Sequence, residues 1–583
     1  MKALAPFAAA LCLAALPLVL PQYWLTLMNF TGLAAIVVLG LVLLTGVGGM
    51  TSFGQAAFVG ISAYTTAWFT TQAGLSPWLT LPLSLAVTAS AALLIGLLTL
   101  GLRGHYLPLS TLAWSMALFY LVGNLPQLGS HDGIGNLPPL SIAGHVLGGR
   151  AFTWLTWGAV GLAFLSARNL LDSRTGRALR ALRGGRIMLQ AFGADIRRLK
   201  LLVFVHAAVL AALSGWLYAH MMRFVSPTPF GISAGIDYLF MAVIGGAASL
   251  WGAIIGSGAV VVARDLLQDI VPGLTGATGA TELLVFGLVV VLVLQRAPGG
   301  ITGRFAPPPR LPRAALSHDA TPLPPRPAMT AEPLLAAQGL TRRFGGLTAA
   351  NDISLSVEKG RILGLIGPNG AGKSTVFDLL TGVTVPDAGR VLLAGQDITD
   401  SKQTAIARAG LARTFQHTRL RGDMTLLENV AIGAHARGGC GALASIFRRD
   451  RAEEARIFAT ARAQLQRLGL EARAEVLAGQ LSQGERRTAE IARALASDPT
   501  VLLLDEPAAG LRHAEKQHLA SLLHQLRAEG LAILIIEHDM RFLLDLVDRV
   551  VVLNFGQQIA EGTPDEVRAN PAVQSAYLGE GEA

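Results

Sequence analysis

A glycine-rich stretch near the middle of the chain has the residue types and the spacing for phosphate chemistry. The sequence RILGLIGPNGAGKSTVFDLL contains the pattern of a phosphate-binding loop, formed by Gly367, Gly372, Lys373 and Ser374. We expect an apolar strand before this loop and a helix after it, so that backbone N–H groups surround phosphate oxygens. Lys373 is expected to bind the β- and γ-phosphates and Ser374 to bind Mg²⁺. Three further residues of the loop complete the predicted phosphate-binding set, namely Asn369, Gly370 and Thr375.

Two adjacent carboxylates follow a second apolar run, VLLLDEP at 501–507. The run is typical of a buried strand, and the acids stand at its end. Asp505 is expected to hold Mg²⁺, directly or through water, and Glu506 to polarise the water that attacks the γ-phosphate. A strand that merely ends in solvated acids would look the same, but the phosphate-binding loop favours the catalytic interpretation.

The elements that position these residues belong to the second of two domains. A chain of 583 residues exceeds what one hydrophobic core usually supports. Strand-like and helix-like segments alternate after the linker, which predicts an α/β ATP-binding domain at 334–583. The first half is almost free of charge, and we predict that residues 1–303 form a polytopic helical membrane domain.

The first domain contains about ten apolar segments, each close to the length that crosses a bilayer. They lie near 4–20, 25–46, 55–72, 79–101, 107–125, 152–167, 201–222, 236–250, 251–266 and 281–296. The first could instead be a cleaved signal peptide, because Lys2 precedes an apolar run. Cleavage would leave the orientation of the other segments unchanged.

One arginine-rich loop, residues 168–200, sets the expected orientation. It carries nine Lys or Arg residues against Asp172 and Asp195, and short basic loops stay in the cytoplasm. Alternation then places everything after residue 296 in the cytoplasm, where ATP is. This topology also explains the net charge of +9 without a nucleic-acid partner. We expect a multi-pass protein of the bacterial inner membrane with a cytoplasmic ATPase domain.

Residues 304–333 are predicted to be a proline-rich linker, because the sequence is too rich in proline for a helix or a central strand. An extended tether of this length would let the attached domain reach its own membrane half or that of a neighbour. The two cysteines, Cys12 and Cys440, lie in different halves, so neither a disulfide framework nor a zinc site is expected.

Small residues are dense at 46–60 and 244–258 in the membrane half. Such segments allow helices to approach closely, and interrupted helices in transporters often line the substrate route. Ordinary helix packing is the simpler interpretation. Polar residues are costly in a bilayer and are candidates for the substrate pathway on that ground alone, and here they include Gln55, Asn124 and Asp237.

The segment LSQGERR at 481–487 follows the phosphate-binding loop and precedes the DEP strand, and with it residues 334–583 resemble an ABC transporter nucleotide-binding domain. The resemblance implies ATP hydrolysis by head-to-tail pairs, in which Ser482 and Gly484 contact the ATP of the partner domain. It also implies that Phe344 stacks on adenine and that His538 contacts the γ-phosphate. Gln416 is implied to sense that phosphate, to contribute to the Mg²⁺ site and to couple to the membrane domain.

Other segments resemble branched-chain amino-acid importers more narrowly. LNFGQQIAEGTPDEV and the ending YLGEGEA are similar to the ATP-binding subunits of this family, and residues 1–303 are similar to one of its permease subunits. The resemblance implies that the arginine-rich loop is the coupling segment on which the ATPase rests. Three departures are Gln483 and Glu485 in the signature, Gln55 where a histidine is expected, and the fusion itself.

The family implies several partners: a second permease, a second ATP-binding subunit, an extracytoplasmic solute-binding protein and the lipid bilayer. Pairing of two copies would also supply two permeases and two ATPases. The favoured function is ATP-driven import of branched-chain amino acids or related small polar solutes, such as urea, amides or aromatic acids. The alternative is a membrane-anchored ATP-hydrolysing sensor, whereas the span number argues against an exporter and the apolar segments exclude a soluble DNA-acting ATPase.

Overall fold

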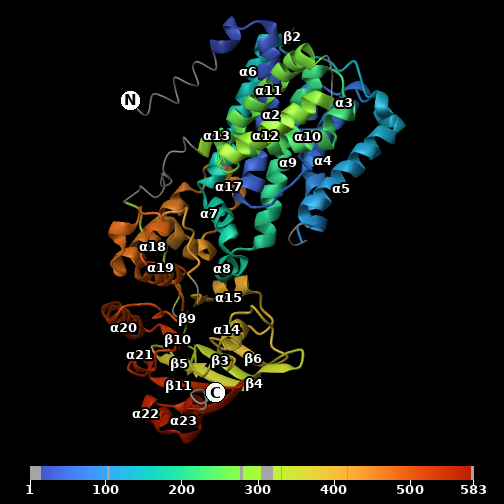
Figure 1. Cartoon of the computed structure of the whole chain (residues 1–583). Helices are drawn as coiled ribbons and strands as arrows, with labels where there is room; N and C mark the ends of the chain where they lie inside the picture. Colours follow the sequence, from blue (N-terminus) through green and yellow to red (C-terminus); the bar gives the residue numbers. More distant parts are fainter. Residues whose placement is uncertain are drawn as a thin grey trace. The chain divides into compact units, whose positions relative to one another are not determined.

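The computed structural model describes residues 15–101, 106–275, 280–297, 299–303, 319–327, 329, 331–416 and 418–578 (Figure 1). The chain divides into two units. The first comprises Met1–Leu171 and Arg197–Pro308, and the second comprises Asp172–Ile196 and Pro309–Ala583. Residues 172–196 of the arginine-rich loop therefore group with the ATP-binding part, although the residues on both sides of this segment belong to the first unit.

The first unit is built from helices, with one short hairpin. Its helices are α2 (Gln22–Leu41), α3 (Gln55–Thr71), α4 (Pro77–Thr99), α5 (Tyr106–Asn124), α6 (Gly149–Leu171), α9 (Ile196–Met222), α10 (Ile232–Gly245), α11 (Leu250–Thr275), α12 (Ala280–Arg296) and α13 (Gly300–Gly303). The hairpin pairs β1 (Ser141–Ile142) with β2 (His145–Val146) in antiparallel register.

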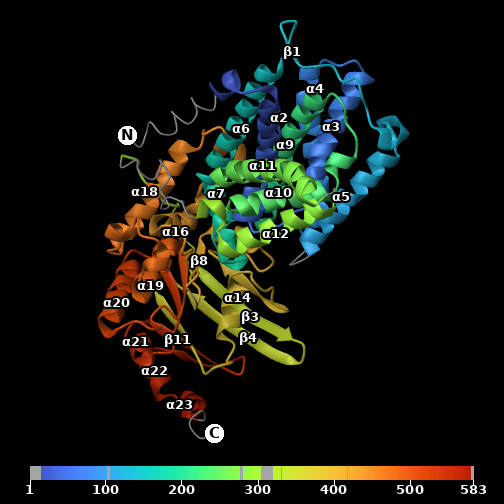
Figure 2. The same cartoon turned by 45° about the horizontal axis from the view of Figure 1, so that its top comes forward.

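Helix α2 is the central helix of this unit and packs against α6, α10 and α11, as both overall views show (Figures 1 and 2). Its residues from Gly32 to Leu41 are all buried, and this part of the helix is apolar on every side. A π-helical turn, Val42–Val47, extends it. There a Cβ on Gly46 would lie 1.4 Å from the carbonyl oxygen of Ala247, so only glycine permits this close approach.

Five helices among the described residues are long and apolar enough to cross a membrane. They are Gln22–Val47, Pro77–Thr99, Tyr106–Asn124, Ile196–Met222 and Leu250–Gln268. Helices α3, α6, α10 and α12 overlap four more of the ten predicted segments but do not meet the same criteria of length and hydropathy. The first predicted segment and Cys12 lie largely or wholly outside the described residues.

The second unit contains two sheets. The larger has the strand order β12-β11-β5-β10-β9-β8, in which all pairs but β11 and β12 are parallel. Its strands are β5 (Ile362–Ile366), β8 (Leu411–Arg413), β9 (Val501–Asp505), β10 (Ala532–Ile536), β11 (Arg549–Asn554) and β12 (Gln557–Gly562). The central strands are buried on both faces, which explains why they are continuous apolar runs.

The smaller sheet is antiparallel, with the order β4-β3-β6-β7. Its strands are β3 (Leu335–Phe344), β4 (Leu347–Val357), β6 (Ala388–Leu393) and β7 (Gln396–Asp397). The helices of the unit are α7 (Arg174–Ala181), α8 (Arg186–Ala191), α14 (Lys373–Leu380), α15 (Gln403–Ala409), α16 (Leu426–Gly433), α17 (Ala442–Ile446), α18 (Arg451–Arg467), α19 (Gln483–Ala496), α20 (His513–Ala528), α21 (Met540–Leu544), α22 (Pro564–Ala569) and α23 (Pro571–Leu578).

Candidate functional site

Three adjacent parallel strands bring the predicted catalytic residues together. Strand β10 lies between β5 and β9, and Ile536 is in register with both Leu365 and Asp505. The phosphate-binding loop leaves the end of β5, the two carboxylates end β9, and His538 follows β10. Because the carboxyl ends of parallel strands meet at one edge of a sheet, segments far apart in the sequence converge there.

Glycines let the phosphate-binding loop fold tightly. Gly367 and Gly372 have positive φ values of 154° and 99°, and a Cβ on either would lie within 2.3 Å of a backbone oxygen, that of Leu553 or Ala349. Gly370 also has a positive φ, 79°, but faces open space, which keeps its backbone accessible to a ligand.

Lys373 is the first residue of α14, and its side chain is nearly buried. Its ammonium group donates hydrogen bonds to the carbonyl oxygens of Gly367, at 2.5 Å, and Pro368, at 2.9 Å. These contacts hold the ammonium group inside the loop that phosphates are expected to enter. Ser374 and Thr375, the next two residues, line the same cavity.

The carboxylate of Glu506 has two polar neighbours. Its Oε1 accepts a hydrogen bond from Gln416 Nε2 at 3.0 Å and lies 3.0 Å from His538 Nε2. Glu506 adopts a left-handed backbone conformation, with φ 48°, and its N–H donates to Ile536 O. A non-glycine residue holds such a conformation only when its surroundings fix it, and such residues are frequent at functional sites.

Asp505 lies deeper than Glu506 and is buried. Its Oδ2 is 3.3 Å from the guanidinium of Arg413, which also contacts Asp378 at 2.5 Å. Burial raises the pKa of the Asp505 carboxyl, and the nearby Arg413 opposes that shift. Arg413 was not predicted from the sequence, because an arginine in a short edge strand carries no motif.

A cavity of about 400 Å³ joins these groups. Most of the predicted ATP-site residues line it: Phe344, Asn369, Gly370, Gly372, Lys373, Ser374, Thr375, Gln416, Glu506 and His538. Gly367 and Asp505 are not part of the lining. Phe555, which lies between β11 and β12, also lines the cavity, and its side chain is 84% exposed. It was not predicted from the sequence, because it belongs to no recognised motif. The only available signal was a large apolar residue in a turn.

The signature residues Ser482 and Gly484 do not line this cavity. Ser482 caps α19: its Oγ accepts from Glu485 N at 3.2 Å, and a carboxylate oxygen of Glu485 accepts from Ser482 N at 2.8 Å. Arg473 Nε also donates to Glu485, at 3.0 Å. The hydrogen bond from Ser482 N is the main cause of a lowered pKa at Glu485, and the contacts with the Ser482 hydroxyl and Arg473 also lower this pKa. The unusual glutamate thus serves as half of a helix cap.

Glu537, which precedes the predicted histidine, connects two parts of the site. Its carboxylate accepts hydrogen bonds from Ala508 N, at 2.5 Å, and from His538 N, at 3.3 Å. Ala508 belongs to the AAGL segment that follows the catalytic strand. Burial raises the pKa of Glu537 to about 7. No spacing rule singled out this residue in the sequence.

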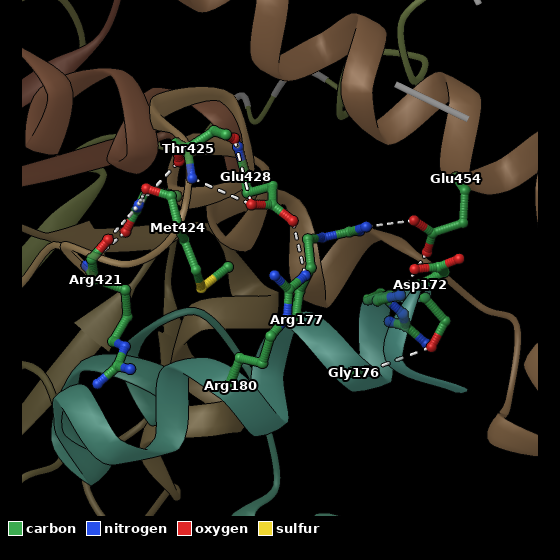
Figure 3. A network of polar contacts seen from close by, with 12 residues as sticks. Asp172, Gly176, Arg177, Arg180, Arg421, Met424, Thr425, Glu428 and Glu454 are labelled. Atoms are coloured by element: carbon green, nitrogen blue, oxygen red, sulfur yellow. Dashed lines mark hydrogen bonds and ion pairs between the residues drawn. The ribbon is translucent and has the colours of Figure 1, made fainter. Parts of the chain in front are cut away.

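The coupling segment, which we define as residues 172–195, docks on the helices of the ATP-binding part through its arginines (Figure 3). Arg177 on α7 forms an ion pair with Glu454 of α18, and both side chains are 1% exposed. The Arg177 guanidinium also lies 4.5 Å from the centre of the Phe458 ring. Arg180 contacts Glu428 at 2.8 Å, and Glu428 is itself part of the cap of α16.

Arg174 supplies the other anchor of the coupling segment. Its guanidinium donates to three backbone carbonyls after α16: His435 at 2.5 Å, Gly438 at 2.6 Å and Cys440 at 2.8 Å. Cys440 is a free cysteine. An arginine fork that binds carbonyls in this way fixes position as well as charge. The basic loop is therefore bound to the ATP-binding part through specific contacts.

The polar candidates in the first unit have different surroundings. Asp237 on α10 forms a bidentate ion pair with Arg264 on α11, with both distances 2.7 Å. Asn124 donates to Tyr120 O at 2.7 Å and caps its own helix end. Gln55 is 1% exposed, and neither of its polar side-chain atoms has a hydrogen-bond partner among the described residues.

These features define an ABC-type ATPase joined to a helical membrane domain, and comparison with known proteins gives the family. The family described as branched-chain amino acid transport system / permease component matches residues 23–294. The ABC transporter family matches residues 350–509, and the family described as branched-chain amino acid ATP-binding cassette transporter matches residues 557–583.

Individual proteins are also similar to this chain. The high-affinity branched-chain amino acid transport ATP-binding protein BraF of Pseudomonas aeruginosa is 43% identical over 251 residues, which cover 42% of this chain and 98% of BraF. LivG of Escherichia coli, of the same description, is 43% identical over 43% of this chain and 99% of LivG. A nucleotide-free ATP-binding cassette from an ABC transporter is 34% identical, with 42% and 98% coverage and a TM-score of 0.38.

The chain therefore belongs to the branched-chain amino acid transport family of ABC transporters, as a fusion of a permease domain with an ATPase domain of the LivG and BraF type. ATP binding and ATP hydrolysis coupled to transport follow from this membership.

Proposed function

We propose that this chain imports branched-chain amino acids, or related small polar solutes, with energy from ATP hydrolysed in the cavity described above. One observation carries the proposal: the Glu506 carboxylate lies 3.0 Å from both the His538 and the Gln416 side chains, beside the phosphate-binding loop. A carboxylate placed next to the phosphates can orient and polarise the attacking water.

The predicted ATP-site residues have the following roles in this scheme. Loop N–H groups, with Asn369, Ser374 and Thr375, bind phosphate oxygens, while Lys373 leaves its loop carbonyls to bind the β- and γ-phosphates. His538 contacts the γ-phosphate and holds Glu506. Phe344 stacks on adenine, and the exposed Phe555 ring supplies a second apolar surface nearby. Ser482 and Gly484 bind the ATP of a partner domain.

The residues present fit a magnesium ion. Mg²⁺ prefers oxygen ligands, and Ser374, Gln416 and Asp505 offer a hydroxyl, an amide oxygen and a carboxylate. Gln416 uses its amide nitrogen on Glu506, which leaves its amide oxygen free of that bond. Bound Mg²⁺ would neutralise charge that develops on the phosphates.

The membrane half is proposed to have about ten spans in the bacterial inner membrane, with the coupling segment and the ATPase in the cytoplasm. The domain limits are proposed as 1–303, 304–333 and 334–583. The basic loop 168–200 and the permease match over residues 23–294 support this arrangement.

A complete importer would contain a second permease, a second ATP-binding subunit and an extracytoplasmic solute-binding protein, unless two copies of this chain pair. The isolated positions of Ser482 and Gly484, away from the cavity, support a paired arrangement in which each signature completes the site of the other domain.

The test is uptake of labelled leucine, isoleucine, valine, urea and benzoate by cells that express the chain with its neighbouring genes. We expect uptake of at least one solute, and Glu506→Gln should lower it about 100-fold or more, because general-base assistance contributes about that much. Glu358→Gln, at a side chain that is 63% exposed, is the matched control. Uptake that is equal in wild type and Glu506→Gln would contradict the proposal.

A further inference from the structure

The end of the proline-rich linker is bound to the ATP-binding part of the chain. Leu323 N donates to Thr460 Oγ1 at 2.9 Å, and Arg326 N donates to Asp498 Oδ2 at 2.5 Å. Arg437 donates in turn to the carbonyl oxygen of Pro324 at 2.6 Å. A proline-rich extended segment has no internal hydrogen bonds, so its backbone groups are free to bind a partner surface.

The Arg326 side chain lies between the C-terminal ends of two helices. It donates to the carbonyl oxygens of Ala407 and Arg408 in the last turn of α15, and to that of Ser497, directly after α19. The last carbonyls of a helix have no partner within the helix and carry partial negative charge. The guanidinium group of this one linker residue therefore caps both α15 and α19, which are separated in the sequence by β8, α16, α17 and α18.

Arg437 reinforces this arrangement from the helical side. It donates to Ala496 O, in the last turn of α19, at 3.2 Å. Its guanidinium also lies 3.6 Å from the Asp498 carboxylate, which accepts from Arg326 N. The linker and the end of α19 are thus held by the same two arginines and the same carboxylate.

One of the two capped helices begins at the signature, and the other packs against the coupling segment. Helix α19 begins at the signature, where Ser482 is its N-cap. Helix α15 packs against α8 of the coupling segment. A Cβ on Gly193, in the same segment, would lie 3.8 Å from Arg408 Cγ, so the coupling segment reaches the residue whose carbonyl Arg326 caps.

We propose that residues 320–327 form a clasp in which Arg326 joins α15 to α19, so that movement of the signature helix is passed to the helix that bears the coupling segment. The proposal rests on the proposed function above. Arg326 is a positioning residue and not a catalytic one, because it lies outside the ATP cavity. In this proposal, the linker of the fused chain also connects two helices of the ATP-binding domain.

The test uses the full chain in lipid vesicles with its neighbouring subunits, and compares Arg326→Ala and Arg326→Lys with wild type. Hydrogen exchange is followed in peptides that cover 405–411 and 493–500, with solute moved per ATP hydrolysed as the second readout. The control is Arg568→Ala, at an exposed arginine on α22.

We expect Arg326→Ala to raise exchange at both helix ends by about threefold or more, since loss of a cap increases local opening. Solute moved per ATP should fall by about threefold or more, with the ATPase rate itself little changed. Lysine should restore part of both, because it keeps the charge but lacks the fork. Equal exchange, or an equal ratio of solute to ATP, in wild type and Arg326→Ala would overturn the clasp.

The exchange measurement needs no transport, so it separates this proposal from the proposed function. If Glu506→Gln still hydrolysed ATP at the normal rate, the proposed function would fail. The exchange at 405–411 and 493–500 would still decide whether Arg326 joins the two helices.

Discussion

Glu506 shows how the fold prepares a single side chain. Its left-handed backbone, φ 48°, turns the chain sharply after the buried strand β9. The bonds from its N–H to Ile536 O and from Gln416 to its carboxylate hold that conformation. The strained backbone conformation of Glu506 therefore fixes the direction of its carboxylate.

Glu537 should make the stability of the ATP-binding domain depend on pH. Its folded-state pKa, about 7, lies above the usual 4.5, so the folded domain keeps a proton that the unfolded chain loses between these values. The free energy of unfolding should therefore fall as pH rises through this window, by at most about 1.4 kcal/mol per pH unit. Thermal unfolding from pH 5 to pH 8, in about one-unit steps, measures this slope.

Glu537→Gln should flatten that dependence. Ala508 N and His538 N donate to different carboxylate oxygens of Glu537, and glutamine replaces one of these oxygens with an NH₂ group. One of the two donors then loses its acceptor, so the variant should be less stable. The change in slope is the informative readout. A slope that persists unchanged in Glu537→Gln would assign the pH dependence to other groups.

At the residue scale, the sequence pointed to residues whose chemistry requires a fixed spacing. The phosphate-binding loop, the DEP carboxylates and His538 follow patterns that the parallel sheet imposes, and most of them line one cavity. Arg413, Glu537 and Phe555 could not be predicted, because their roles arise from neighbours distant in the sequence. The roles of the site residues themselves stay predictions.

At the scale of elements, the coupling segment is held by contacts between residues that lie far apart in the sequence. An arginine buried to 1% exposure is stable only with a partner, and Glu454 supplies that partner from a helix about 280 positions later. The sequence analysis identified the basic loop but not its partner, because a charge pattern says nothing about which acidic residue will face it.

Glu454→Ala should separate ATP hydrolysis from transport. Removal of one partner of a buried pair costs roughly 3–5 kcal/mol, because the other charge is left buried and unpaired. Arg177 would then lose its place on α18, and we expect solute uptake to fall about tenfold or more while ATP turnover by the purified chain is retained. The measurement is uptake and phosphate release in parallel.

Glu475→Ala, at an exposed side chain, is the matched control for Glu454→Ala and should leave both quantities unchanged. Uptake at the wild-type level in Glu454→Ala would mean that the ion pair does not carry coupling.

The membrane elements were predicted less fully than the ATPase elements. Helices occur at nine of the predicted positions, but α10 has 14 residues and α3 has 17, and the sequence alone did not show where short helices pack into a bundle. The hydropathy of a segment indicates whether it lies in an apolar environment, whereas the length of its helix depends on helix tilt and on the neighbouring helices. The proline-rich linker was predicted as a tether, and the bonds of residues 323–326 to the ATPase could not be derived from composition.

For the whole molecule, alternation of spans predicts which loops face each side of the membrane. In a background without Cys12 and Cys440, His145→Cys should react with a membrane-impermeant maleimide in intact cells, because it lies in the loop between α5 and α6. Arg183→Cys should react only after the cells are permeabilised. The opposite labelling would reverse the proposed orientation.

The fusion joins transport and hydrolysis in one chain, and the central claim is that solute accumulation depends on ATP hydrolysis. The most direct test measures ATP-dependent solute accumulation and phosphate release in the same vesicles, for wild type and Glu506→Gln. The account predicts that wild type accumulates solute only while it hydrolyses ATP and that Glu506→Gln does neither. Accumulation without hydrolysis, or full accumulation by Glu506→Gln, would contradict it.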